Sequence, residues 1–450
     1  MKKIDRRSFL KAMGIMGAAA ALTACGGSAS STASSTGAAS STTSSAADGA
    51  AALRFTWWGG QSRNDYTQQL LKLYESENAG ITFEATPSGW DGYFEKLATD
   101  TATGAMPDLV QMDYMYIATY AGNDSLADLS SFTADGTLDV SNIDESLLSA
   151  GEIDGKLVGI PLSTSLVSFP YDKTVLAEAG VDEPTGEWTW DDFKQICLTV
   201  KEKTGKYGFD GGPVEDTNLF NYWVRSHGGK LFADDNKSLG YDDDAITADF
   251  FQLFKDLMDA GAAPNPDEYE QIATLGKEGS PIVTHDAAFH QGWNNDVTIY
   301  AAAGNTDIGL ATPPQGTAKG ALWYKPGMFF SVAATSQNQK AAATFINWFL
   351  NGEEANDVIM GERGTPSSSA MRDYLTNSGK LSDAQIQMFD YVTTAADYCS
   401  DTPNPDPAGI SEINTAFKDI AYSVFYGQVS AADGAAEFRA QADSILAANN

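Results

Sequence analysis

Leu53–Trp58 (LRFTWW), Ile81–Thr86 (ITFEAT) and Asp108–Met112 (DLVQM) are the three short runs that decide the fold. Each run has the apolar content, and the first two have the β-branched and aromatic residues, that are typical of β-strands. Residues 64–77 and 90–103 separate them and show the apolar spacing of amphipathic helices. Because strands and helices alternate in this order, the sequence predicts parallel βαβ units and an α/β layered domain.

Helical periodicity recurs through the rest of the chain, at Trp188–Lys203, Asp249–Ala260 and Lys340–Leu350. Thr189 is the expected N-cap of the first of these helices. Residues 154–161 (DGKLVGIP) predict a hairpin that leads into an extended run. The chain has 450 residues, of which 43% are apolar, so it is long enough for two domains or one large one.

The formal net charge of −32 limits which kinds of molecule the protein can bind. Such a surface repels nucleic-acid phosphates and anionic lipid headgroups. The composition therefore excludes nucleic-acid binding as the main function and leaves small-molecule or protein partners open.

The first 52 residues are predicted to be an export signal followed by a spacer, and not part of the folded domains. Residues 1–24 combine a basic start with a 13-residue apolar stretch, too short to span a membrane, and so predict a signal peptide. The pair Arg6-Arg7 is typical of twin-arginine export, with general export as the alternative. Leu22-Thr23-Ala24-Cys25 predicts lipidation of Cys25, which would become the mature N-terminus. Residues 25–52, rich in Ser, Thr, Ala and Gly, predict a flexible tether.

No catalytic signature is found in the sequence. Gly-x-Ser-x-Gly, His-Glu-x-x-His and phosphate-loop motifs are missing, and His227, His285 and His290 are wrongly spaced for a zinc site. We therefore expect neither an enzyme nor a metal or other cofactor, although paired carboxylates for sugar hydrolysis stay open among 60 acidic residues. Cys197 and Cys399 are too few for a disulfide framework, and a bridge between them stays open.

Aromatic residues follow the predicted strands where turns normally carry small polar residues. In an open α/β sheet, ligands bind beyond the carboxyl ends of the strands. Large flat rings beside amide and charged groups suit a sugar, because its C–H face stacks on the ring while its hydroxyls need hydrogen-bond partners. These loops are residues 57–63 (WWGGQSR), 87–90 (PSGW) and 113–116 (DYMY), and the same composition recurs around Trp223, Trp293 and Trp323. Trp188, Trp190 and Trp348 lie at or within helices and are interpreted as packing residues.

Six motifs in order resemble the extracellular solute-binding proteins of ABC importers, specifically sugar-binding family 1, related to maltose-binding protein. They are residues 55–60 (FTWWGG), 105–110 (AMPDLV), 154–161 (DGKLVGIP), 179–190 (AGVDEPTGEWTW), 325–336 (KPGMFFSVAATS) and 362–366 (ERGTP). The resemblance implies a two-lobed periplasmic-binding-protein fold of type II, with a hinge between the lobes and the ligand enclosed between them. It implies an N-lobe at 53–162 plus 323–370 and a C-lobe at 163–322 plus 371–450.

The resemblance and the loop positions together predict the ligand contacts. The candidate residues are Trp57, Trp58, Gln61, Arg63, Trp90, Asp113, Tyr114, Trp223, Trp293, Trp323 and Arg363. The many rings favour an oligosaccharide over a monosaccharide, while Arg63, Arg225, Lys325 and Arg363 keep acidic sugars open.

The expected protein is a monomer held at the outer face of the cytoplasmic membrane by its lipid, and it delivers the sugar to ABC permease subunits. Two alternatives belong to other classes. A lipid-anchored glycoside hydrolase would also line a cleft with Trp and carboxylates, and a surface adhesin could use the same tether and rings without a transporter.

Overall fold

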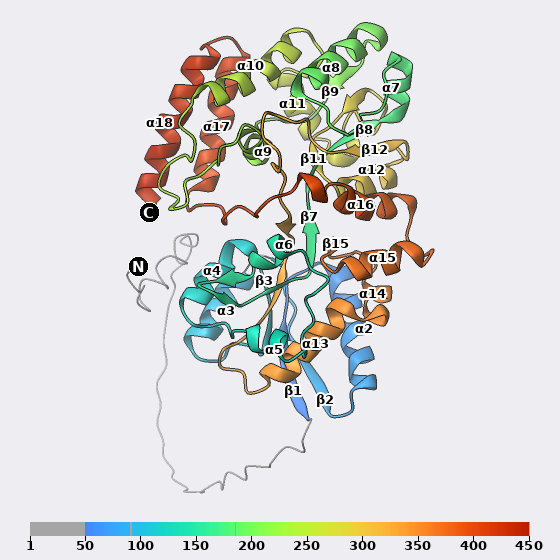
Figure 1. The fold of residues 1–450 in the computed structure, drawn as a ribbon, viewed down its shortest axis with the longest axis vertical. Helices are drawn as coiled ribbons and strands as arrows, with labels where there is room; N and C mark the ends of the chain where they lie inside the picture. The colour runs from blue at the N-terminus through green and yellow to red at the C-terminus, as the bar shows by residue number, and fades with distance from the viewer. Residues whose placement is uncertain (1–49, 91, 185, 450) are drawn as a thin grey trace, which may run out of the picture.

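The computed structural model describes residues 50–90, 92–184 and 186–449. The predicted signal peptide, Cys25 and nearly all of the tether lie outside these ranges. Within them, none of the helices has both the length and the apolar character that a membrane crossing requires. The chain forms two lobes, joined by crossing segments near β7 (Ser163–Ser165) and β15 (Thr365–Pro366) (Figure 1).

The N-lobe is built on a five-stranded sheet in the order β2-β1-β3-β14-β6. β1 pairs in parallel with β2 and β3, as the strand–helix alternation predicts, whereas β14 runs antiparallel to β3 and β6. A small hairpin, β4–β5, turns at Asp154 and Gly155, both with positive φ. The bounds of the strands are β1 Ala51–Thr56, β2 Ile81–Ala85, β3 Leu109–Met112, β4 Glu152–Ile153, β5 Lys156–Leu157, β6 Ile160–Pro161 and β14 Phe329–Val332.

Helices cover this sheet because their apolar faces bury Leu, Tyr and Phe side chains against it. Leu70 and Tyr74 of α2 and Phe345 of α13 are buried in this way. The helices are α2 Gln61–Glu77, α3 Tyr93–Ala102, α4 Tyr114–Gly122, α5 Ser130–Ala134, α6 Glu145–Ser149, α13 Gln339–Asn351, α14 Glu353–Ile359 and α15 Ser369–Asn377.

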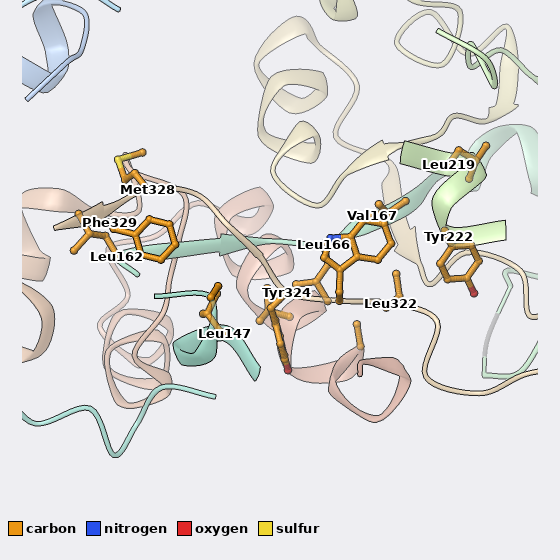
Figure 2. Close-up of a cluster of buried hydrophobic side chains, with 14 of the residues drawn as sticks. Leu147, Leu162, Leu166, Val167, Leu219, Tyr222, Leu322, Tyr324, Met328 and Phe329 are labelled. Atoms are coloured by element: carbon orange, nitrogen blue, oxygen red, sulfur yellow. The ribbon is translucent and has the colours of Figure 1, made fainter. Parts of the chain in front are cut away.

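Three short strands form the hinge between the lobes, in the order β13-β7-β15. They are β7 Ser163–Ser165, β13 Lys325–Pro326 and β15 Thr365–Pro366. Buried apolar side chains continue along these crossing segments from one lobe to the other (Figure 2), among them Leu162, Leu166, Leu322 and Tyr324. The hinge is therefore part of the hydrophobic core rather than a solvated linker.

The C-lobe contains a second sheet, ordered β11-β8-β10-β9, in which β12 also pairs with β8. All six residues of β8 are buried, including the polar Ser168 and Asp172, because the strand lies inside this sheet. The strands are β8 Val167–Asp172, β9 Tyr207–Phe209, β10 Ala287–Phe289, β11 Gly292–Trp293 and β12 Ile308–Ala311.

Helix α8 (Trp190–Thr204) begins at the N-cap that the sequence predicts. Thr189 Oγ1 accepts a hydrogen bond from the Asp192 amide at 3.1 Å, and the Asp192 carboxylate accepts one from the Thr189 amide at 2.8 Å. This capping box confirms Thr189 as the N-cap of α8. The C-lobe helices are α7 Lys173–Ala179, α8 Trp190–Thr204, α9 Asn218–Ser226, α10 Ala245–Asp259, α11 Pro266–Ala273, η1 Lys277–Gly279, α12 Asp296–Ala303, α16 Asp383–Thr394, η2 Ala396–Tyr398, α17 Ile410–Phe425 and α18 Ala431–Asn449.

The last crossing between the lobes differs from the expected position at residue 370. α15 packs against α13 and α14 of the N-lobe, whereas α16 packs against α12 and β12 of the C-lobe. The chain therefore leaves the N-lobe between residues 377 and 383. The sequence motif at 362–366 corresponds to β15. The sequence of the helix that follows does not indicate which lobe that helix belongs to.

Candidate functional site

Three cavities lie between the lobes and share lining residues. A cavity of about 440 Å³ is lined by residues of both lobes and of the hinge, including Trp90, Trp293 and Lys325. A second, of about 320 Å³, shares Tyr114 and Lys325 with it, and a third, of about 1170 Å³, shares Ser165 and Asn295 with it. We call these the central, α9-side and α12-side cavities, and together they form the interlobe cleft.

Trp90 enters the central cavity from the loop that follows β2. Its side chain is 45% exposed, which is unusual for the largest apolar side chain. Trp58 packs edge-on against it with the ring centroids 5.2 Å apart, and Trp58 is itself buried. Trp58 therefore supports Trp90 rather than facing the cleft.

Asp113 and Tyr114 follow β3 at the carboxyl edge of the N-lobe sheet. Asp113 caps α4 by accepting a hydrogen bond from the Met115 amide at 2.9 Å. Burial raises the pKa of its carboxyl, and Lys325 partly offsets this shift. Tyr114 Oη donates to the carbonyl of Pro403 at 2.7 Å, so it bridges to the C-lobe segment between η2 and α17.

Trp293 faces the same cavity from β11 in the C-lobe. Its amide donates to Asp296 Oδ2 at 3.0 Å, and a Cβ at Gly292 would collide with that carboxylate oxygen. Only glycine before Trp293 permits this close approach. Lys325 Nζ lies 4.4 Å from the centroid of the Trp293 ring. The hinge lysine and the C-lobe tryptophan therefore meet across the cleft.

Trp323 and Arg225 line the α9-side cavity together. The guanidinium carbon of Arg225 lies 5.3 Å from the centroid of the Trp323 ring. Arg225 donates to the Ala321 carbonyl at 2.8 Å and to the Ser400 hydroxyl at 2.8 Å. Burial lowers the pKa of Arg225, and Asp401 partly offsets this shift.

Arg63 lines the α12-side cavity at its N-lobe wall. The guanidinium donates to the Trp58 carbonyl at 3.4 Å. Of the predicted contacts, the structure thus brings Trp90, Asp113, Tyr114, Trp293 and Trp323 together in the two linked cavities, with Arg63 in the third.

Three other predicted residues do not line the cleft. Trp57 is fully buried in the N-lobe core, where its Nε1 donates to Asn64 Oδ1 at 3.0 Å. Trp223 is buried in the C-lobe against Trp190, and its Nε1 donates to the Ile246 carbonyl at 2.8 Å. Gln61 is exposed at the start of α2 and donates to Asp65 at 2.7 Å. The positions of these side chains and of Trp58 therefore correct the sequence prediction that they contact the ligand.

Arg363 touches the wall of the α12-side cavity but is only 4% exposed. It donates to Gln111 and, at 3.0 Å, to Thr67 Oγ1. Its guanidinium carbon lies within 5.4–5.5 Å of the rings of Tyr66, Phe330 and Phe349. Burial lowers its pKa to about 10. The side chain therefore holds the β15 loop onto the N-lobe core, so its structural role explains its position.

The sequence prediction omitted three polar residues that line the cleft, Asn218, Asn221 and Asp406, and it named Lys325 only as a charge that keeps acidic sugars open. Burial raises the pKa of Asp406, and Lys325 partly offsets this shift. The Pro- and Asp-rich composition of residues 402–408 is the one sequence signal that could have marked Asp406, since loops of that kind carry function more often than helices.

Cys197 and Cys399 are free thiols, which answers the question of a bridge between them. In the described ranges, no group of three His, Cys, Asp or Glu side chains is arranged to hold a metal ion.

Two α/β lobes around a cleft, joined by strands that cross between them, define the class of two-lobed solute-binding proteins. The chain belongs to the bacterial extracellular solute-binding protein family, whose model matches residues 60–355. The resemblance inferred from the six sequence motifs is thus confirmed, and the family consists of binding proteins rather than enzymes.

Individual relatives agree with this assignment. The diacetylchitobiose binding protein DasA of Streptomyces coelicolor is 27% identical over 70% of this chain and 73% of its own length. A family 1 extracellular solute-binding protein from Alicyclobacillus acidocaldarius is similar in structure, with a TM-score of 0.79 and 27% identity over 88% of this chain and 99% of that one. A periplasmic oligogalacturonide binding protein from Yersinia enterocolitica has a TM-score of 0.73 and 25% identity over 88% of this chain and 99% of that one.

Proposed function

We propose that this protein captures an oligosaccharide between its two lobes and delivers it to an ABC importer. One observation carries the proposal: Trp90, Trp293 and Trp323 line the interlobe cleft from both lobes, beside amide and charged side chains. Rings beside hydrogen-bonding groups match the two faces of a sugar, because the C–H face stacks and the hydroxyls pair. The names of two relatives, one binding diacetylchitobiose and one oligogalacturonide, support the same ligand class.

The extent of the cleft supports a ligand of several sugar units. The central cavity shares Tyr114 and Lys325 with its neighbour on one side, and Ser165 and Asn295 with its neighbour on the other. A small-molecule site usually buries most of its ligand and is matched to it in size. A single sugar ring would fill only part of this groove, so a longer ligand fits better.

A titration experiment tests the function. Calorimetry of the purified protein against neutral and acidic oligosaccharides of two to five units should find at least one ligand with a dissociation constant of about 1 µM, or about −8 kcal/mol. The same sugars, recovered after incubation, should be uncleaved. Failure of every sugar in the panel to bind would contradict the proposal, and cleavage would favour the glycoside hydrolase.

The proposal includes a monomer anchored by lipid at Cys25 on the outer face of the membrane, where it meets the permease subunits. The sequence Leu22-Thr23-Ala24-Cys25 supports the anchor. Changing Cys25→Ala should release the protein from the membrane fraction. If the variant still sediments with membranes, the lipid assignment is wrong.

A further inference from the structure

The proposed function leaves open whether the sugar is uncharged or carries carboxylates, and the charges along the cleft bear on this choice. Among the described residues, the charged side chains that line the central cavity are Asp113, Lys325 and Asp406. Both carboxyl groups interact electrostatically with Lys325, and burial raises the pKa of each. Within the described part of the chain, one ammonium group therefore lines this cavity beside two carboxyl groups.

The other cations that line the α9-side cavity already have protein partners. Lys230 forms an ion pair of 2.6 Å with Asp234. Arg225 donates to the carbonyls of Ala321 and Asp401, at 2.8 and 3.0 Å. A sugar carboxylate entering the α9-side cavity would compete with Asp234 for Lys230, and protein oxygens already take three hydrogen bonds from Arg225, so its gain over the water it leaves would be reduced.

The same arrangement suits an uncharged sugar. A hydroxyl both donates and accepts hydrogen bonds, so it can donate to a carboxylate while it accepts from the Lys325 ammonium. A uronate offers only acceptor oxygens at its charged group, and it would place a third negative charge beside Asp113 and Asp406. The formal net charge of −32 also repels an anionic sugar at long range.

We propose that the central cavity selects uncharged oligosaccharides over uronate-containing ones, and that Asp113, Lys325 and Asp406 together make this choice. The proposal rests on the proposed function, since it specifies the ligand class of the same cleft. Rings on both lobes bind either kind of sugar, so it is the carboxylates that set the preference.

Matched sugar pairs test the proposal by calorimetry on the whole protein. Each pair shares linkage and stereochemistry and differs only at C6, as in α-1,4-galactobiose and α-1,4-digalacturonic acid, with equivalent gluco-configured pairs. For each pair that binds, we expect the uncharged member to bind at least about tenfold more tightly, since like charges placed side by side cost more than this. A uronate that binds as tightly as its neutral partner overturns the inference and leaves the proposed function standing. Binding of no sugar at all overturns both.

Variants test whether these three residues set the preference. The double change Asp113→Asn and Asp406→Asn should narrow the ratio between neutral and acidic sugars by about tenfold, whereas Lys325→Gln should widen it. Asp154→Asn is the matched control, because it removes one carboxylate at an N-lobe hairpin whose φ of 51° asparagine tolerates. An unchanged ratio in the double variant and in Lys325→Gln, with folding verified by circular dichroism, would assign the selection to other residues and overturn the proposal.

Discussion

Changing Trp293→Ala should remove a ligand contact without removing a core residue. The side chain is only partly buried, and the backbone on either side is held independently by β11 and by the hydrogen bond to Asp296. Stacking supplies about 0.5–1.5 kcal/mol beyond buried area. Covering about 50 Å² of ring face adds about 1.2 kcal/mol at about 25 cal/mol per Å². The expected loss is therefore about 2 kcal/mol, or about thirtyfold in dissociation constant.

Trp57→Ala is the contrasting variant, because the sequence assigns both tryptophans the same role. Trp57 is fully buried and bonded to Asn64, so its truncation should leave a cavity and cost about 3–5 kcal/mol of folding stability. Trp57→Phe, which keeps most of the packing, guards against a variant that fails to fold. The folded fraction of either should bind the sugar within about twofold of the parent, because truncation of a residue outside the interface leaves the contacts intact.

Calorimetry for affinity and differential scanning for melting temperature separate the two effects. The account predicts weak binding with near-normal melting for Trp293→Ala, and near-normal binding with a melting temperature lowered by about 4–6 °C for Trp57→Ala. Suppose that Trp293→Ala binds the sugar normally, while the fully folded Trp57→Ala variant loses affinity. The ligand would then lie against the loop that follows β1. The assignment of the central cavity would then be refuted.

Two further predictions concern buried side chains. Arg363→Ala should lower the free energy of unfolding by about 3 kcal/mol, since Gln111 and Thr67 lose a charged hydrogen-bond partner in the core; denaturant titration measures this, and a change below about 1 kcal/mol would contradict the structural role. Burial raises the pKa of Cys399 to about 12 and that of Cys197 well above its ordinary value. At pH 8 the native Cys399 should hold about a thousandfold less thiolate than a free cysteine, so both thiols should react with iodoacetamide only after unfolding; fast labelling of the native protein would show that one of them is accessible.

Much of the fold follows from local sequence patterns. The first three strands and the two intervening helices appear within a few residues of their predicted positions, because each has a strong apolar period. The two-residue alternation of β1 also explains why Trp57 is a core residue and not a ligand contact. Leu53, Phe55 and Trp57 alternate along one face and all three are fully buried, so the inward register of β1 continues beyond its last paired residue.

The site was less accessible to sequence reasoning, because its parts come from distant segments. Tyr114 bonds to Pro403, 289 residues away, and Lys325 of the hinge meets Trp293 of the C-lobe. Of the aromatic residues that follow the predicted strands, Trp90 and Tyr114 line the central cavity, and their contact with a ligand stays a prediction. For Asp406 the sequence offers only the weaker signal of its Pro- and Asp-rich loop, which does not distinguish it among 60 acidic residues.

Small-angle X-ray scattering, with and without a saturating oligosaccharide identified by calorimetry, tests the central claim most directly. If the sugar is held between two lobes that move on the β7, β13 and β15 strands, the radius of gyration should fall on binding while the mass stays constant. Trp293→Ala at the same sugar concentration should show a smaller change. Identical scattering profiles with the parent protein fully occupied would contradict capture by closure of the lobes.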